Sequence, residues 1–123
     1  MDLGCYHVHS LRHLAPWTGG EPVVESAAAT ELPGAPGVDE TLTTAFRYPS
    51  GVPATAVCSM VADRREFSLR LIGTTGEALA VNYVQPHLDD RILLRRGEVT
   101  TVEHLGTRSS YTCLLYTSDA ADE

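Results

Sequence analysis

Residues 42–61, LTTAFRYPSGVPATAVCSMV, decide the fold because they read as two strands joined by a tight turn. The runs 42–48 and 53–61 are rich in Thr, Val and Ala, which favour strands. Pro49, Ser50 and Gly51 between them are typical turn residues. Two such runs around a turn predict an antiparallel hairpin, and we take this hairpin as the centre of a β-sheet.

Further strands are expected on the C-terminal side of this hairpin. Residues 67–72 alternate, with Phe67, Leu69 and Leu71 on one side, as in a half-buried antiparallel strand. Turn residues around 73–76 and at Gly97 predict two more hairpins. The additional strands are expected at residues 78–84, 91–95 and 98–103, and a surface loop is expected at 32–37.

The N-terminal segment predicts a helix over residues 3–15, with Asp2 as its N-cap. An apolar stripe with helical period is formed by Gly4, Val8, Leu11 and Ala15. Pro16 and the following glycines end the helix. The fold class is therefore α+β, an N-terminal helix packed on an open, mostly antiparallel sheet.

Composition narrows the classes of function. The chain has 123 residues, enough for one domain of ordinary size, and a formal net charge of −7. That charge argues against nucleic acid or an anionic membrane as a partner. No apolar run reaches the roughly 20 residues of a membrane span, and no secretory signal is visible, which favours the cytoplasm. The cysteines are scattered and odd in number, so reduced thiols are expected, with Cys5 and Cys58 as buried filler.

The last eleven residues, CLLYTSDAADE, differ in texture from the rest of the chain. They match the translation of a transposase-end adapter that is used to prepare sequencing libraries. We therefore expect residues 113–123 to be a non-native tail and residues 1–112 to be the domain.

Candidate chemistry gathers on the first helix. Asp2, Tyr6, His9 and His13 follow one another at spacings of four, three and four, which places them on one side. A carboxylate beside a phenol can orient a substrate hydroxyl while the phenol transfers a proton. The ordinary phenol pKa of about 10 must be lowered by a cation for this work at neutral pH. The sequence contains no lysine, so an arginine or a lysine from outside must serve.

A purely structural interpretation stays open. In it Asp2 is only a cap, Tyr6 is an aromatic residue at the edge of the core, and the histidines, with His7, are solvated. Trp17 then packs the helix end. We expect no metal site, because His9 and His13 are only two ligands and nothing places His87 or His104 beside them.

The segment MDLGCYHVHSLRHL, followed by GGEPVVESA, resembles the start of the C-terminal domain of the Gfo/Idh/MocA oxidoreductases. That family carries a pattern like G-G-G-x-L-x-D-x-G-x-[HY]-x-x-x-x-x-R-x-L and then G-x-P. FRYPSGVPATAVCSM and LRLIGTTGEALAV are similar to two of its later strand pairs. The resemblance covers nearly all of residues 1–112.

The resemblance implies an enzyme in which a separate Rossmann domain binds NAD or NADP and the first helix of this domain faces the nicotinamide. Asp2 matches the family aspartate that contacts substrate, and Tyr6 matches the acid/base residue, which is histidine in many members. Tyrosine at this position resembles dihydrodiol dehydrogenases and glucose-fructose oxidoreductase. The lysine partner belongs to an E-K-P motif of the Rossmann half.

The same resemblance implies hydride transfer to or from a hydroxyl or carbonyl carbon of a sugar, polyol or related cyclic alcohol. His9 is a further candidate for substrate contact. The chain has no G-x-G-x-x-G motif, so no turnover is expected from it alone. The open sheet is expected to form a homo-oligomer. The alternative is a non-catalytic member that serves assembly or ligand sensing.

Overall fold

The computed structural model of the chain describes residues 4–106, which divide after Asp63 into two compact units. Asp2, Cys113, the expected tail at 113–123 and the expected domain end at residue 112 lie outside the described residues. No helix in the described part of the chain has the length and apolar character to cross a membrane.

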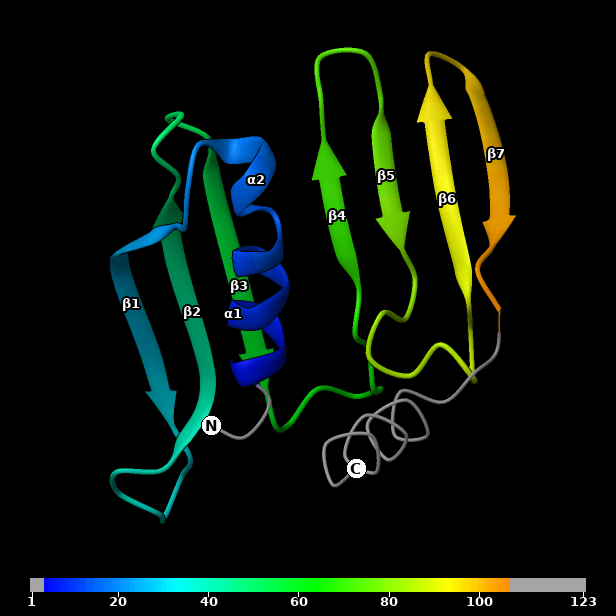
Figure 1. Cartoon of the computed structure of the whole chain (residues 1–123). Coiled ribbons are helices and arrows are strands. Elements are labelled where there is room, and N and C mark those ends of the chain that lie inside the picture. Colours follow the sequence, from blue (N-terminus) through cyan, green and yellow to red (C-terminus); the bar gives the residue numbers. More distant parts are fainter. Residues whose placement is uncertain (1–3, 107–123) are drawn as a thin grey trace, which may run out of the picture. The chain divides into compact units, whose positions relative to one another are not determined.

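The first unit is a three-stranded antiparallel sheet with two short helices (Figure 1). Its strand order is β1-β2-β3, and α1 packs against β3. The elements are α1 (Gly4–His13), α2 (Ala15–Thr18), β1 (Val23–Glu31), β2 (Asp39–Arg47) and β3 (Pro53–Ser59). The predicted α+β class is confirmed.

The hairpin β2–β3 forms where the sequence predicts it. Phe46 pairs with Ala54 and Leu42 pairs with Cys58 along the ladder. The Gly51 N–H donates to the Tyr48 carbonyl at 2.8 Å, and Gly51 has a φ of 85°, which glycine adopts without strain. The turn chemistry therefore fixes the register of the strands on which α1 rests.

A small core joins α1 to this hairpin. The buried side chains are those of Leu11, Phe46 and Ala56, with Leu14 and Ala54 packed around them. Tyr48 is only 3% exposed, and its hydroxyl donates a 2.7 Å hydrogen bond to the Leu11 carbonyl. Burial raises the pKa of this hydroxyl, which keeps it a hydrogen-bond donor. Leu11 of α1 is thus held by the burial of its side chain and by a hydrogen bond to its backbone carbonyl.

The rotation of α1 differs from the predicted apolar stripe. Val8 is 41% exposed, whereas His7 and Leu14 lie half-buried on the same side of the helix as Leu11. Two interpretations of the helix face share Leu11: one adds Val8, and the other adds His7 and Leu14. Contact with Phe46 and Ala56, which come much later in the sequence, decides between them.

The predicted end of the helix is also refined. The chain breaks after His13 and continues as α2, in which Pro16 occupies the first turn. Gly19 caps α2 in the left-handed conformation with a φ of 79°. The Ser50 N–H then donates to the Thr18 carbonyl at 3.1 Å, which ties the end of α2 to the hairpin turn. Trp17 is 79% exposed, so the expectation that it packs the helix end is wrong.

The second unit is a four-stranded antiparallel sheet in sequential order. Its strands are β4 (Leu69–Ile72), β5 (Glu77–Ala80), β6 (Arg91–Arg96) and β7 (Val99–His104). Strand β4 begins at Leu69, two residues after the predicted start at Phe67. Phe67 is nevertheless buried and forms a bridge to Asn82. Strand β5 ends at Ala80, whereas the sequence predicted an end at residue 84. His104 is the last residue of β7, whereas it was expected in a loop.

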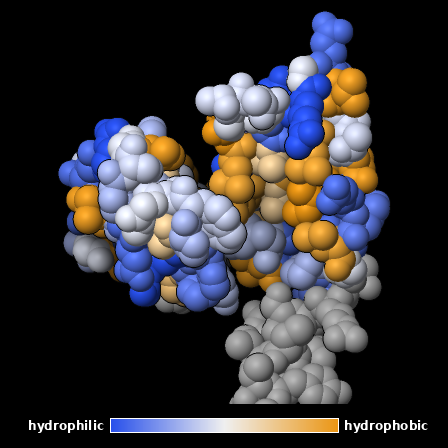
Figure 2. Space-filling view, turned by 45° about the horizontal axis from the view of Figure 1, so that its top comes forward, coloured by the Kyte–Doolittle hydropathy of each residue, from blue (hydrophilic) through white to orange (hydrophobic). Residues whose placement is uncertain are grey.

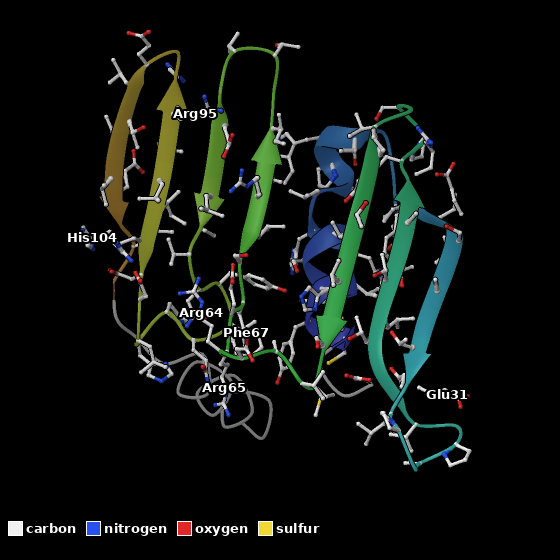
Figure 3. The ribbon with its side chains drawn as sticks, turned by 180° about the vertical axis from the view of Figure 1, so that it is seen from behind. Glu31, Arg64, Arg65, Phe67, Arg95 and His104 are labelled. Carbon is white, nitrogen blue, oxygen red and sulfur yellow. The ribbon has the colours of Figure 1, made fainter. Side chains whose placement is uncertain are left out.

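This second sheet leaves apolar side chains on its surface, as Figure 2 shows. None of the residues in β4–β7 is buried, and Ile72 is 77% exposed. On the face that carries Ile72, Glu77 accepts from Arg70 at 3.1 Å and from Arg95 at 2.8 Å, and the Arg95 bond is the main reason that the Glu77 pKa is lowered. Arg95 and His104 lie at opposite ends of the β6–β7 hairpin (Figure 3). Strands β4–β7 are therefore held by their hydrogen-bond ladders and by half-buried apolar side chains.

The hydroxyl of Tyr48 is expected to stabilise the first unit through Leu11. Tyr48→Phe removes the donor, and the Leu11 carbonyl keeps only the hydrogen bond from the Leu14 N–H at 3.1 Å. The free energy of unfolding should therefore fall by about 0.5–1.5 kcal/mol. Urea unfolding followed by circular dichroism measures this loss. Tyr6→Phe, the same chemical change at an exposed position, is the control and should have a much smaller effect. Equal effects of the two substitutions would contradict the role of this bond.

Gly76 is expected to be required by the close approach of β5 and β6. A Cβ at this position would overlap the carbonyl oxygen of Arg95. Gly76→Ala should therefore destabilise the second unit by about 1–3 kcal/mol, seen as faster amide hydrogen exchange in β5 and β6. Gly73→Ala is the matched control, because its Cβ would meet its nearest atom at an ordinary 3.6 Å. Unchanged exchange in Gly76→Ala would refute the steric argument.

Candidate functional site on helix α1

The exposed side of α1 carries the described residues that the sequence singles out. Tyr6 is 39% exposed, and His9 and His13 are exposed on the same helix. Within residues 4–63, α1 packs against β3 and α2, and its buried side is the one that carries Leu11. Asp2 lies outside the described residues, so the Asp2–Tyr6 pairing stays a prediction.

His9 and His13 are in direct contact. Their Nε2 atoms are 2.9 Å apart, and their rings meet edge to face with centroids 4.4 Å apart. The predicted helical spacing thus brings these two rings together. His104 is engaged elsewhere, since its Nδ1 lies 2.8 Å from a carboxylate oxygen of Asp90. Residues 4–106 contain no cluster of three or more His, Cys, Asp or Glu placed to hold a metal ion.

Both arginines of the first unit are engaged with glutamates. Arg12 lies 2.8 Å from Glu21, and Arg47 holds Glu25 with bonds of 2.8 and 3.1 Å. The hydrogen bond from Arg47 lowers the pKa of Glu25. The charges of both arginines in this unit are thus already engaged by carboxylates.

A histidine and a cysteine meet beneath α1. His7 Nδ1 lies 3.4 Å from the Sγ of Cys58, and Cys58 is buried as predicted. Burial is the main cause that raises the pKa of this thiol, so it stays protonated and is a poor nucleophile. His7 is thus half-buried against the sheet instead of solvated, and Cys5 is exposed instead of buried.

Two residues with a role in this helix escaped the sequence prediction. His7 could have been found from its spacing of four and seven to Leu11 and Leu14, which marks one helix face. Tyr48 carries no local signal, because its bond to Leu11 spans 37 residues.

The comparison with protein families gives one result. The family model described as the GFO/IDH/MocA C-terminal domain matches residues 1–79, more than half of the chain. The chain therefore belongs to the GFO/IDH/MocA family, which is generally one of oxidoreductases that bind NAD(P) through an N-terminal domain. The matched segment includes the whole first unit with α1 and its exposed residues. No curated protein and no solved structure matches the chain.

Proposed function

We propose that the chain is the substrate domain of an NAD(P)-dependent oxidoreductase and that Tyr6 is its acid/base residue. The observation that carries the proposal is the position of Tyr6 on the exposed side of α1, opposite the side that packs on β3. A phenol at that position can meet a substrate and a second domain. The dinucleotide domain would be supplied by sequence outside residues 1–123.

The residues of this chain fit a nicotinamide cofactor held mainly by that other domain. The exposed side of α1 offers a surface with a proton carrier, whereas nothing in residues 4–63 offers a glycine-rich phosphate cradle. The cofactor, when bound, supplies the hydride chemistry. The protein contributes position and proton transfer.

Tyr6 would take the proton of a substrate hydroxyl as the alcohol is oxidised and return it in the reverse direction. Asp2 would orient that hydroxyl, and His9 would add a further substrate contact one turn along the helix. Because Arg12 and Arg47 are already paired, the cation that prepares the phenol would be a lysine of the other domain. Tyrosine instead of histidine at position 6 supports a sugar, polyol or related cyclic alcohol as substrate.

The test of this function is the effect of Tyr6 on turnover in the chain joined to its dinucleotide domain. Oxidation of a panel of sugars and polyols is followed by the absorbance of the reduced nicotinamide. Tyr6→Phe should lower kcat by about 10²–10⁴-fold with a smaller effect on KM, because only proton transfer is removed.

Tyr6→His is the matched rescue variant, because histidine is the other acid/base residue that the family resemblance implies at this position. It should retain more activity than Tyr6→Phe. Full activity in Tyr6→Phe, or no activity in any variant including the parent protein, would contradict the assignment.

We also propose that the second sheet forms a homo-oligomer in the intact protein. Its surface supports this, since Leu71 and Val99 on one face are at least 40% exposed. Ile72 and Val102, on the opposite face, are exposed to at least the same extent. A hollow of about 570 Å³ is lined by Leu71, Ala78 and Leu94 on one face of this sheet. Exposed apolar area of this kind is typical of association surfaces.

A further inference from the structure

The two exposed imidazoles of α1 have a geometry that suits metal chelation. His9 and His13 lie one turn apart, with their Nε2 atoms at 2.9 Å and their ring planes at 86°. One Nε2–H donates to the lone pair of the other Nε2, so the two nitrogens point at each other, and each ring has to turn for both lone pairs to meet a shared ion. Neutral imidazole nitrogen is the commonest metal ligand in proteins.

The spacing of the nitrogens is compatible with right-angled coordination of an ion. With bonds of about 2.0–2.1 Å from ion to nitrogen, two nitrogens 2.9 Å apart subtend an angle of about 90° at the ion. A tetrahedral ion with the same bonds would need nitrogens about 3.3 Å apart. Right-angled nitrogen and oxygen coordination is typical of Cu²⁺ and Ni²⁺. We propose that His9 and His13 form a two-nitrogen site for Cu²⁺ or Ni²⁺, with water in the remaining positions.

Binding requires a local exchange of hydrogens and a rotation of the two rings. The ring that donates its Nε2–H moves that proton to Nδ1 by tautomer exchange through solvent, and the ion then binds both Nε2 lone pairs to one side of the line that joins the nitrogens. No net proton is released by this exchange, because the moved hydrogen stays on the same ring. Because both side chains are exposed, they can reorient without loss of core packing. Arg12, on the same helix, forms an ion pair with Glu21 at 2.8 Å, so its positive charge is partly balanced beside the site.

Helical structure explains why two ligands suffice here. The backbone of α1 already holds the imidazoles one turn apart, so the entropy of bringing them together is lost on folding and not on binding. The sequence alone excluded a metal because it offered no third ligand near His9. The distance between the ring nitrogens is the observation that the sequence could not supply.

An occupied site would also affect the chemistry of α1. His9 is the residue that we propose as a further substrate contact, so an ion on His9 would compete with substrate. This consequence rests on the proposed function, whereas ion binding itself does not.

The test is a calorimetric titration of the full chain with Ni²⁺, which avoids the oxidation of thiols by Cu²⁺. The parent chain should bind one ion, and His9→Ala and His13→Ala should each weaken that binding by about tenfold or more, since each leaves a single ligand. His87→Ala removes another exposed histidine and is the matched control. Cys5→Ser removes the exposed thiol four residues before His9 and should leave binding intact.

Thermal unfolding supplies a second readout on the same proteins. Ni²⁺ should raise the melting temperature of the parent chain, His87→Ala and Cys5→Ser, and should not raise that of His9→Ala or His13→Ala. Binding that survives both histidine substitutions, or that is lost in Cys5→Ser or His87→Ala, would overturn the site. Ni²⁺ binding in a protein without oxidoreductase activity would uphold the site and count only against the proposed function.

Discussion

The attachment of Leu11 to the β2–β3 hairpin is the interaction on which the rest of the site depends. Its side chain is buried with Phe46 and Ala56, and its carbonyl accepts a hydrogen bond from the buried hydroxyl of Tyr48. These two contacts fix both the position and the rotation of α1. The rotation in turn places Tyr6 and His9 on the exposed side, where a substrate, a cofactor domain or an ion can reach them.

Local chemistry made the hairpins predictable, and long-range packing made the helix face unpredictable. The turn at Pro49–Gly51 and the alternation at 67–72 encode strands within a few residues, and the structure places strands there. By contrast, the choice between Val8 and Leu14 as the buried residue depends on Phe46, which lies more than thirty residues away. The spacing of apolar residues predicts which face of a helix is buried only when those residues fit a single face.

The contact between His9 and His13 was predictable from the sequence, whereas other contacts of α1 were not. The spacing of four between His9 and His13 predicts two rings on one side, and the structure brings them together. Neither the contact of His7 with Cys58 nor the exposure of Cys5 follows from the sequence, since both depend on the same rotation of α1. Family membership adds the oxidoreductase class, and the exposed side of α1 is where we propose that this chain contributes to it.

The central claim, that Leu11 faces the sheet and Tyr6 faces outward, is tested most directly by nuclear magnetic resonance of the chain with a soluble paramagnetic probe. The account predicts contacts between the Leu11 methyl groups and the Phe46 ring, and strong broadening of the Tyr6 and His9 signals by the probe. Contacts from Val8 to Phe46 in place of those from Leu11, with Tyr6 protected from the probe, would contradict it.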